Sequence, residues 1–343
     1  MPPDRTMRFR GVLPVVTIAE ALVRARAYLR ARGVAGASLD AEVLLAHCTG
    51  LDRAGLYREA GRELGRKEAG FFRELVRRRA AREPVAYLVG HREFMGLDFA
   101  VGPGVLIPRP ETELLVEEAL ALLGKMRGAA GTSGGPGAPG PAGSGHGPPA
   151  RAPGDPAAAG GRARFPGNRT LRLAEAGTGS GAVAVSLARH LPGAHIHATD
   201  ISRQALETAR QNALRHGVAE RITFWAGDLL APLLEQKISR LDLVAANLPY
   251  VPGDRLADLM PDVRLYEPLT ALDGGPDGLA LYRRLEPQAR RLLAPGGYLL
   301  MEIDPSQVPL LAGFLDRREW EYYVRRDLAG RDRLVVARRK KGY

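Results

Sequence analysis

Apolar residues recur at steps of three and four along the first quarter of the chain, which is the spacing of a helix with one buried face. Residues 18–29, 39–46 and 71–76 follow this spacing, and short connections containing glycine separate them. This part of the sequence shows no strand-like alternation of polar and apolar residues. We therefore expect a small helical bundle over about residues 17–82.

From residue 87 to residue 107 the pattern changes to short alternating segments broken by glycine and proline, which predicts a β-hairpin connector. A helix should then begin near Glu111, because Pro110 suits the first helical position and acidic residues suit the first turn. Arg109, Glu111 and Thr112 could line a cofactor pocket, or they could lock the connector to the domain that follows.

Beyond residue 168 short aliphatic runs alternate with helical stretches. This order is typical of an α/β fold with a doubly wound sheet. The last two runs are joined by a short turn and suit an antiparallel hairpin at the end of the sheet. The expected strands lie at about residues 170–176, 195–199, 222–227, 241–246, 297–303, 321–325 and 333–336.

A segment of low complexity precedes the expected sheet. Residues 127–168 are mostly Gly, Ala, Pro and Ser, and they cannot bury enough apolar surface to offset their chain entropy. We expect this insert to be disordered and assign it no function. The chain then divides into an N-terminal helical domain (1–86), a β-hairpin linker (87–108) and a larger domain (109–343) that contains the insert.

Composition narrows the class of protein. The chain has 343 residues, of which 45% are hydrophobic, so it is long enough for two domains with a full core. It shows neither an apolar run that could cross a membrane nor a secretory pattern, which predicts a cytoplasmic protein without a membrane partner. The single cysteine, Cys48, excludes an internal disulfide framework and a multi-cysteine zinc site.

Charge and histidine content exclude two further classes. The formal net charge is +11, but the arginines are scattered and no basic-aromatic RNA-binding motif appears, so we expect no stable nucleic-acid partner. Among the seven histidines only His195 and His197 approach the spacing of metal ligands, and packing along one strand explains this pair. We expect no metal site, and we expect a monomer.

A glycine-rich loop directly follows the expected strand at 170–176. Its residues are Gly177, Thr178, Gly179, Ser180 and Gly181. The glycines permit a tight turn and a close approach of the backbone to a ligand held over the N-terminus of the next helix. The dinucleotide spacing Gly-x-Gly-x-x-Gly is absent, and Glu175 opens the loop with an acid that is ill suited to a pyrophosphate. This arrangement favours a cationic or zwitterionic ligand such as S-adenosylmethionine (SAM).

Two more expected strands end in acidic residues. Asp200 follows the loop by about 20 residues, where a carboxylate can accept hydrogen bonds from ribose hydroxyls. Asp228, followed by Leu229, comes where an adenine amino group could be capped. Either aspartate alone could be a strand-end turn former, but three loops in register with Asn247 favour one shared cofactor site.

The tetrapeptide Asn247-Leu248-Pro249-Tyr250 directly follows the apolar run 241–246. It should therefore lie at the rim of the sheet, where open α/β folds bind ligands. Asn247 supplies an acceptor oxygen, Pro249 exposes the preceding carbonyl group while donating nothing, and Tyr250 offers a flat face. These features suit a planar group that carries an NH2, which predicts an enzyme that modifies an amide or amino nitrogen.

Seven other segments follow the pattern of one known family. They lie at residues 82–90, 93–97, 105–113, 266–272, 275–279, 296–303 and 327–333. The most specific is Pro-Arg-Pro-Glu-Thr-Glu at 108–113. With the Asn-x-Pro-Tyr motif, they make the chain resemble the release-factor glutamine methyltransferases, the HemK/PrmC family, over nearly all of its length outside the insert.

The resemblance implies a Rossmann-like SAM-dependent methyltransferase sheet and transfer of the SAM methyl group to a glutamine side-chain nitrogen (N5). The glutamine is that of the Gly-Gly-Gln motif in class 1 peptide chain release factors. The resemblance also implies that the N-terminal domain helps to recognise this protein substrate, and the alternative is that the domain is a stabilising cap. The Asn247 side-chain oxygen and the Leu248 carbonyl would hold the two amide hydrogens, and Tyr250 would pack against the amide plane. No general base is required, because the nitrogen becomes acidic once it is methylated.

Two alternatives remain open. The Asn-x-Pro-Tyr motif is shared with adenine methyltransferases, and Leu248 stands where many family members have proline. Because rRNA adenine dimethyltransferases can carry Asn-Leu-Pro-Tyr, an adenine-N6 methyltransferase acting on rRNA or DNA is the first alternative. A SAM-binding scaffold without activity is the second. The helical domain and the segment 108–113 speak against the first, and the intact tetrapeptide and glycine loop speak against the second.

Overall fold

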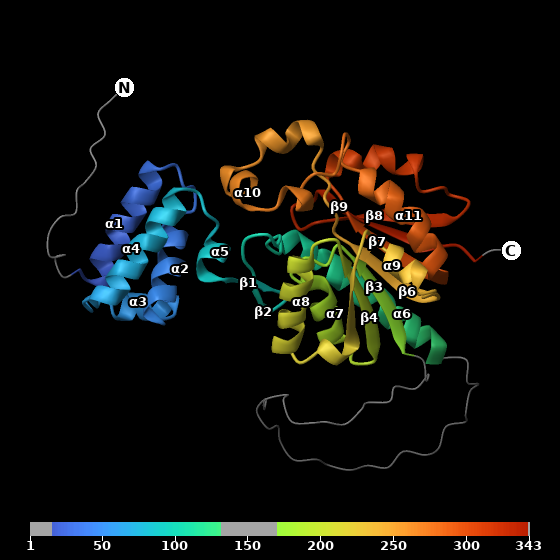
Figure 1. Cartoon of the computed structure of the whole chain (residues 1–343), viewed down its shortest axis with the longest axis horizontal. Coiled ribbons are helices and arrows are strands. Elements are labelled where there is room, and N and C mark those ends of the chain that lie inside the picture. The colour runs from blue at the N-terminus through green and yellow to red at the C-terminus, as the bar shows by residue number, and fades with distance from the viewer. Residues whose placement is uncertain (1–15, 132–169, 342–343) are drawn as a thin grey trace, which may run out of the picture. The chain divides into compact units, whose positions relative to one another are not determined.

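The computed structural model describes residues 16–131 and 170–341, and these residues form two compact units (Figure 1). The first unit is built from residues 16–92, 100–107 and 254–271. The second unit is built from residues 93–99, 108–131, 170–253 and 272–341.

The first unit is mainly helical, as predicted. Its first helix begins with a capping box, in which the Thr17 hydroxyl accepts a hydrogen bond from the Glu20 N–H and the Glu20 carboxylate accepts one from the Thr17 N–H. The apolar faces of the helices pack into one core that includes Leu29, Leu44 and Leu75, all fully buried. The helices are α1 (Ile18–Ala31), α2 (Ala37–Thr49), α3 (Arg53–Arg58), α4 (Arg66–Ala80) and α5 (Val85–Val89).

A segment from much later in the sequence also belongs to the first unit. Within residues 254–271, Asp262 forms an ion pair with the buried Arg79 at 2.7 Å. A buried guanidinium needs such a partner. The Tyr266 hydroxyl donates a hydrogen bond to the backbone carbonyl of Ala81, the residue after α4. The sequence-based division places residues 254–271 in the domain 109–343, because it assumes that each domain is one continuous stretch of the chain. The segment contains α10 (Pro261–Tyr266) and η4 (Leu269–Ala271) and follows the start of η3 (Gly253–Asp258).

The predicted β-hairpin is formed by β1 (His91–Phe94) and β2 (Leu97–Ala100), which pair with each other as a two-stranded sheet in the described part of the chain. Met95 and Gly96 connect them with positive φ angles of 52° and 71°, as a tight hairpin turn requires. The connector differs from expectation at its beginning, where residues 87–89 complete α5. Gly90, with a φ of 81°, ends that short helix in the left-handed conformation.

The second unit contains a seven-stranded sheet within its described residues, with the strand order β5-β4-β3-β6-β7-β9-β8. The first five strands in this order are parallel, and β9 and β8 are antiparallel to their neighbours. The predicted strand positions and the terminal antiparallel hairpin are confirmed. The strands are β3 (Leu171–Ala176), β4 (Ala194–Asp200), β5 (Ile222–Ala226), β6 (Leu241–Ala246), β7 (Leu293–Glu302), β8 (Trp320–Arg326) and β9 (Asp332–Arg339).

Helices cover both faces of this sheet. Successive residues of β3 face opposite sides: Leu173 packs in a core with α6, α7 and α8, whereas Ala174 packs in a core with α9 and α11. Helix α6 continues over residues 127–131, so the predicted insert begins later than expected, and its remainder, 132–168, lies outside the described residues. The helices are α6 (Glu113–Gly131), α7 (Ala182–His190), α8 (Arg203–Arg215), α9 (Ala231–Glu235) and α11 (Ala280–Leu292), with short turns η1 (Pro110–Thr112), η2 (Ala219–Arg221) and η5 (Pro305–Gly313).

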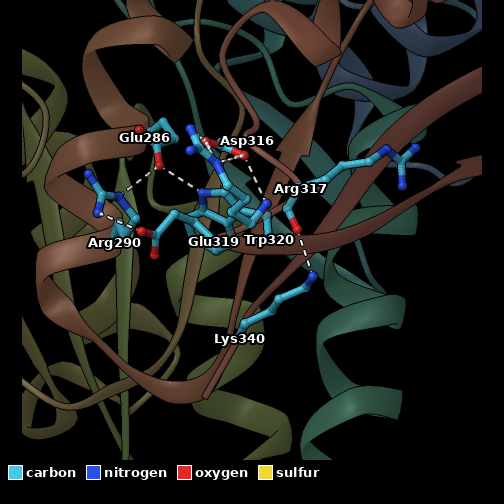
Figure 2. A network of polar contacts seen from close by, with 8 residues as sticks. Glu286, Arg290, Asp316, Arg317, Glu319, Trp320 and Lys340 are labelled. Carbon is cyan, nitrogen blue, oxygen red and sulfur yellow. Dashed lines mark hydrogen bonds and ion pairs between the residues drawn. The ribbon is translucent and has the colours of Figure 1, made fainter. Parts of the chain in front are cut away.

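The terminal hairpin is attached to α11 by a polar network (Figure 2). The buried Trp320 donates from its indole nitrogen to Glu286 at 2.7 Å, and Glu286 also pairs with Arg290 at 3.2 Å. The Lys340 ammonium group donates to the Arg317 carbonyl at 2.6 Å. The Trp320 bond joins the start of β8 to α11, and the Lys340 bond joins the residue after β9 to the segment before β8, so both lie at the open end of the β8–β9 hairpin. The hairpin pairs through β9 with β7, whose last residue belongs to the site described next.

Candidate active site

The predicted site residues meet at one edge of the sheet because they follow the carboxyl ends of neighbouring parallel strands. Ala176 at the end of β3 is in register with Thr199 of β4 and with Ala246 of β6. The glycine loop therefore begins beside Asp200 and Asn247, which are the next residues of those two strands. This edge brings together the glycine loop, Asp200 and the tetrapeptide, and the turn after β5 carries Asp228.

The glycine loop turns back on itself through three left-handed residues: Gly177, Gly179 and Gly181 have φ angles of 74°, 54° and 80°. A Cβ atom at Gly177 would lie 2.9 Å from Leu248 Cδ2, so only glycine lets the loop lie this close to the tetrapeptide. A Cβ atom at Gly179 would meet no described atom within 4 Å. The tip of the loop thus leaves space for a ligand, whereas its base is packed.

Glu175 holds this loop from inside the protein. It is 4% exposed, and its Oε2 atom accepts hydrogen bonds from the Thr178 hydroxyl at 2.6 Å and from the Ala184 N–H at 3.1 Å. Burial raises the pKa of Glu175 to about 8, with a smaller contribution from the Asp200 charge, and these two hydrogen bonds oppose the rise. The carboxyl group thus joins the Thr178 side chain of the loop to the first turn of α7, so its expected effect on a cofactor would act through the loop.

The raised pKa of Glu175 predicts how the free energy of unfolding of the SAM-free protein depends on pH, and Glu175→Gln tests this dependence. Between about pH 4.5 and about pH 8 the folded state keeps a proton that the unfolded state releases, so stability should fall as pH rises through this window. The slope should be at most about 1.4 kcal/mol per pH unit, the value for one proton. Glu175→Gln should remove it, as measured by denaturant unfolding at several pH values. The exposed Glu207→Gln is the control, and an unchanged slope in Glu175→Gln would contradict the assignment.

The two aspartates differ in their surroundings. Asp200 accepts backbone hydrogen bonds from Gly179 at 2.9 Å and from Ser202 at 2.8 Å, one on each oxygen. An ionised carboxylate has about four acceptor positions, so capacity remains for ribose hydroxyls. Asp228 lies two residues beyond the end of β5 and forms an exposed ion pair with Arg284. Leu229 follows it with a φ of 49°, a left-handed conformation that is unusual for leucine.

The rest of the loop belongs to the scaffold. Ser180 is buried, and its carbonyl group accepts a hydrogen bond at 2.8 Å from the side-chain amide of Asn212 on α8. A Cβ atom at Gly181 would lie 3.0 Å from Ala209 Cβ, so this glycine lets α8 approach the start of α7. Asp200, at the end of β4 and beside an open glycine turn, fits a ligand that carries ribose hydroxyls, as SAM does.

The Asn247 side chain is fixed by a residue from η1. Its Nδ2 atom donates to the Thr112 hydroxyl oxygen at 2.9 Å, so Thr112 contacts the tetrapeptide, and this contact is compatible with both sequence-based alternatives for Thr112. The Leu248 N–H donates to the Tyr282 hydroxyl at 3.1 Å, and this hydroxyl in turn donates to the Glu302 carbonyl. A proline at position 248 could not make the first of these bonds.

Glu302, at the end of β7, is the buried acid behind the tetrapeptide. Its Oε1 atom accepts a hydrogen bond from the Tyr250 hydroxyl at 3.3 Å. Burial raises the pKa of Glu302, and the Thr112 hydroxyl, the Arg333 charge and the Tyr250 hydroxyl oppose the rise. Burial and the Glu302 charge raise the pKa of Tyr250, which keeps its hydroxyl a donor. The sequence pointed to Glu302 only as part of a family segment, and its position near the end of the fifth expected strand (297–303) was the available signal.

The backbone of the tetrapeptide is held by a glycine-rich turn at 274–278. The Gln307 side-chain amide donates to the Tyr250 carbonyl at 2.8 Å and to the Asp277 carbonyl at 3.2 Å. A Cβ atom at Gly274 would lie 2.7 Å from the Pro249 carbonyl oxygen. The chain therefore fixes Pro249 and Tyr250 through main-chain contacts that depend on glycine.

Neither a metal site nor a membrane-spanning helix is found in the described residues. Within 16–131 and 170–341 no group of three or more His, Cys, Asp or Glu residues is placed to hold a metal ion. Over the same ranges no helix is long and apolar enough to span a membrane.

Comparisons with known proteins agree with this architecture. A family model described as the PrmC N-terminal domain matches residues 20–90, and one described as a methyltransferase domain matches residues 168–318. A release factor glutamine methyltransferase from Moorella thermoacetica is 42% identical over 328 residues, which cover 95% of this chain and 99% of that protein. One from Geobacter sulfurreducens is 39% identical over 323 residues, which cover 94% of this chain and 96% of that protein.

Proposed function

The chain belongs to the release factor glutamine methyltransferases, and we propose on that premise that it methylates N5 of the glutamine in the Gly-Gly-Gln motif of class 1 peptide chain release factors. It is an enzyme, its cofactor is SAM, and its substrate is a release factor protein. Adenine-N6 methylation of rRNA or DNA is not favoured, because the two relatives that cover 94% and 95% of the chain carry the glutamine activity in their names.

One observation carries the proposal for the site: the Asn247 side-chain amide is held by Thr112 at the sheet edge, directly beside the glycine loop that touches Leu248. A group bound to the tetrapeptide would therefore lie next to a ligand bound at the loop. We assign cofactor binding to Asp200, Asp228, Leu229, Asn247, and the loop 177–181 together with the Glu175 that holds it.

The reaction requires a poor nucleophile to be aligned. An amide nitrogen shares its lone pair with the carbonyl group, so it attacks only when its geometry is right and its developing positive charge is stabilised. The Asn247 Oδ1 atom and the Leu248 carbonyl oxygen are the two acceptors that would hold its hydrogens. Tyr250 would pack on the amide plane. SAM, when bound, supplies the methyl group.

The experiment that tests the proposal is methylation of an unmodified cognate release factor, mapped by tandem mass spectrometry. We expect a single methyl group on the Gly-Gly-Gln glutamine. Parallel reactions with rRNA and DNA provide the competing outcome, and label on adenine with none on the release factor would overturn the proposal.

We also propose that the protein acts as a monomer in the cytoplasm, without a stable nucleic-acid partner. Its arginines are scattered along the sequence, and many form ion pairs with acidic neighbours, as Arg79 does with Asp40 and Asp262. Light scattering of the purified protein, alone and with RNA, would test both points. A dimer mass or a stable RNA complex would refute them.

A further inference from the structure

We propose that Thr112 and Glu302 are positioning residues that decide which end of the Asn247 side-chain amide faces the substrate. This inference rests on the proposed function, because it explains how Asn247 comes to present an acceptor to an NH2 group. The three residues come from η1, the end of β7 and the end of β6, all within the second unit.

The side chain of Asn247 needs such a device because its two ends have nearly the same shape. The oxygen and the NH2 group of an amide can exchange places by a rotation that changes packing very little. Only a hydrogen-bond partner of fixed polarity can distinguish them. With Nδ2 toward the substrate, Asn247 would present a donor to the donors of the glutamine amide, and the contact would be repulsive.

Thr112 supplies a partner at the required distance. Its hydroxyl oxygen accepts from Asn247 Nδ2 at 2.9 Å, which leaves Oδ1 as the end available to a substrate. A hydroxyl group, however, carries both a hydrogen and lone pairs, so Thr112 alone could bond to either end of the amide. Its polarity must be set by a further group.

Glu302 is that group. Its Oε1 atom accepts from the Tyr250 hydroxyl at 3.3 Å, and its buried Oε2 atom has no hydrogen-bond partner among the described residues. Burial raises the pKa of Glu302, and the nearby Thr112 hydroxyl and Arg333 charge oppose that rise and favour the charged form. In its charged form Glu302 has no hydrogen to donate, so its Oε2 atom would take the single hydrogen of Thr112. Thr112 can then only accept from Asn247. Thr112 and Glu302 are 5% and 1% exposed, so water competes little for these bonds.

The test compares variants in the release factor assay at saturating SAM. Thr112→Val keeps the shape of the side chain but removes its hydrogen bonds, and we expect kcat to fall about tenfold. Thr112→Ser keeps the hydroxyl and should restore most of the rate. Glu302→Gln replaces one acceptor with a donor and should lower kcat in the same way. The matched control is Thr223→Val, which removes a threonine hydroxyl bonded to His195 at 2.9 Å on β5 and should leave kcat unchanged.

A double variant separates positioning from a general structural effect. If Thr112 acts through Asn247, then Thr112→Val should cause no further loss in an Asn247→Ala background, whereas a structural defect would lower the rate again. A wild-type rate for Thr112→Val, or full additivity in the double variant, would overturn the inference and leave the proposed function standing. If the wild type instead labels adenine, the proposed function fails, and the same ratios measured on adenine decide the inference, since that acceptor is also an NH2 group.

Discussion

Asn247→Ala should lower kcat for release factor methylation by about 10²–10³-fold, the range seen when one preorganised hydrogen-bond group is removed from an active site. The substitution removes the Oδ1 acceptor that we assign to the substrate amide. It should change the stability of the fold little, because the side chain is only partly buried and its hydrogen bond is to one hydroxyl group. Single-turnover transfer at saturating SAM measures the effect on the chemical step without a contribution from cofactor affinity.

The matched variant for this prediction is Thr223→Val, which alters a hydrogen bond of the same sheet outside the tetrapeptide. Its rate should equal that of the wild type. SAM affinity and the unfolding midpoint of Asn247→Ala should be measured beside its rate. A near-normal rate with intact SAM binding would remove Asn247 from the mechanism and leave the Leu248 carbonyl as the acceptor to examine.

Much of the site could be predicted because its parts are local in sequence. The glycine loop and the tetrapeptide each follow directly on an aliphatic run, and parallel strands bring the residues after such runs to one edge of a sheet. In the structure Ala176 is in register with both Thr199 and Ala246, and this register places the residues after the three strands at the same edge of the sheet. The fold class followed in the same way from the order of the strands.

The contacts that orient the site could not be predicted from local patterns. Thr112 lies 135 residues from Asn247 in the sequence, and nothing in either neighbourhood specifies that the two side chains bond. The same holds for Asp262, whose bond to Arg82 joins residues 180 apart and helps to place 254–271 in the first unit. Such pairings depend on how the complete chain packs, and single-sequence patterns carry no record of them.

Gly278→Ala should be the most damaging glycine substitution near the tetrapeptide. Gly278 is buried with a φ of 76°, and a Cβ atom there would overlap the Tyr250 carbonyl oxygen and the Gln307 side-chain nitrogen. The protein would have to displace Tyr250 or lose the hydrogen bond from Gln307 that holds its carbonyl. We expect the free energy of unfolding to fall by about 3 kcal/mol. We expect kcat to fall about a hundredfold, because a displacement near 1 Å in an active site has that effect.

Gly330→Ala separates the overlap from the strain of the backbone conformation. Gly330 has the same φ of 76°, but it is exposed and a Cβ atom there would meet no described atom within 4 Å. It should therefore lose only about 1 kcal/mol, the strain of a left-handed alanine, and keep its rate. The difference between the two variants, measured by denaturant unfolding and by single-turnover transfer, reports the overlap with the Tyr250 carbonyl and the Gln307 side chain. Equal losses in both would mean that Gly278 serves only its own turn, and that the position of Tyr250 does not depend on the 274–278 segment.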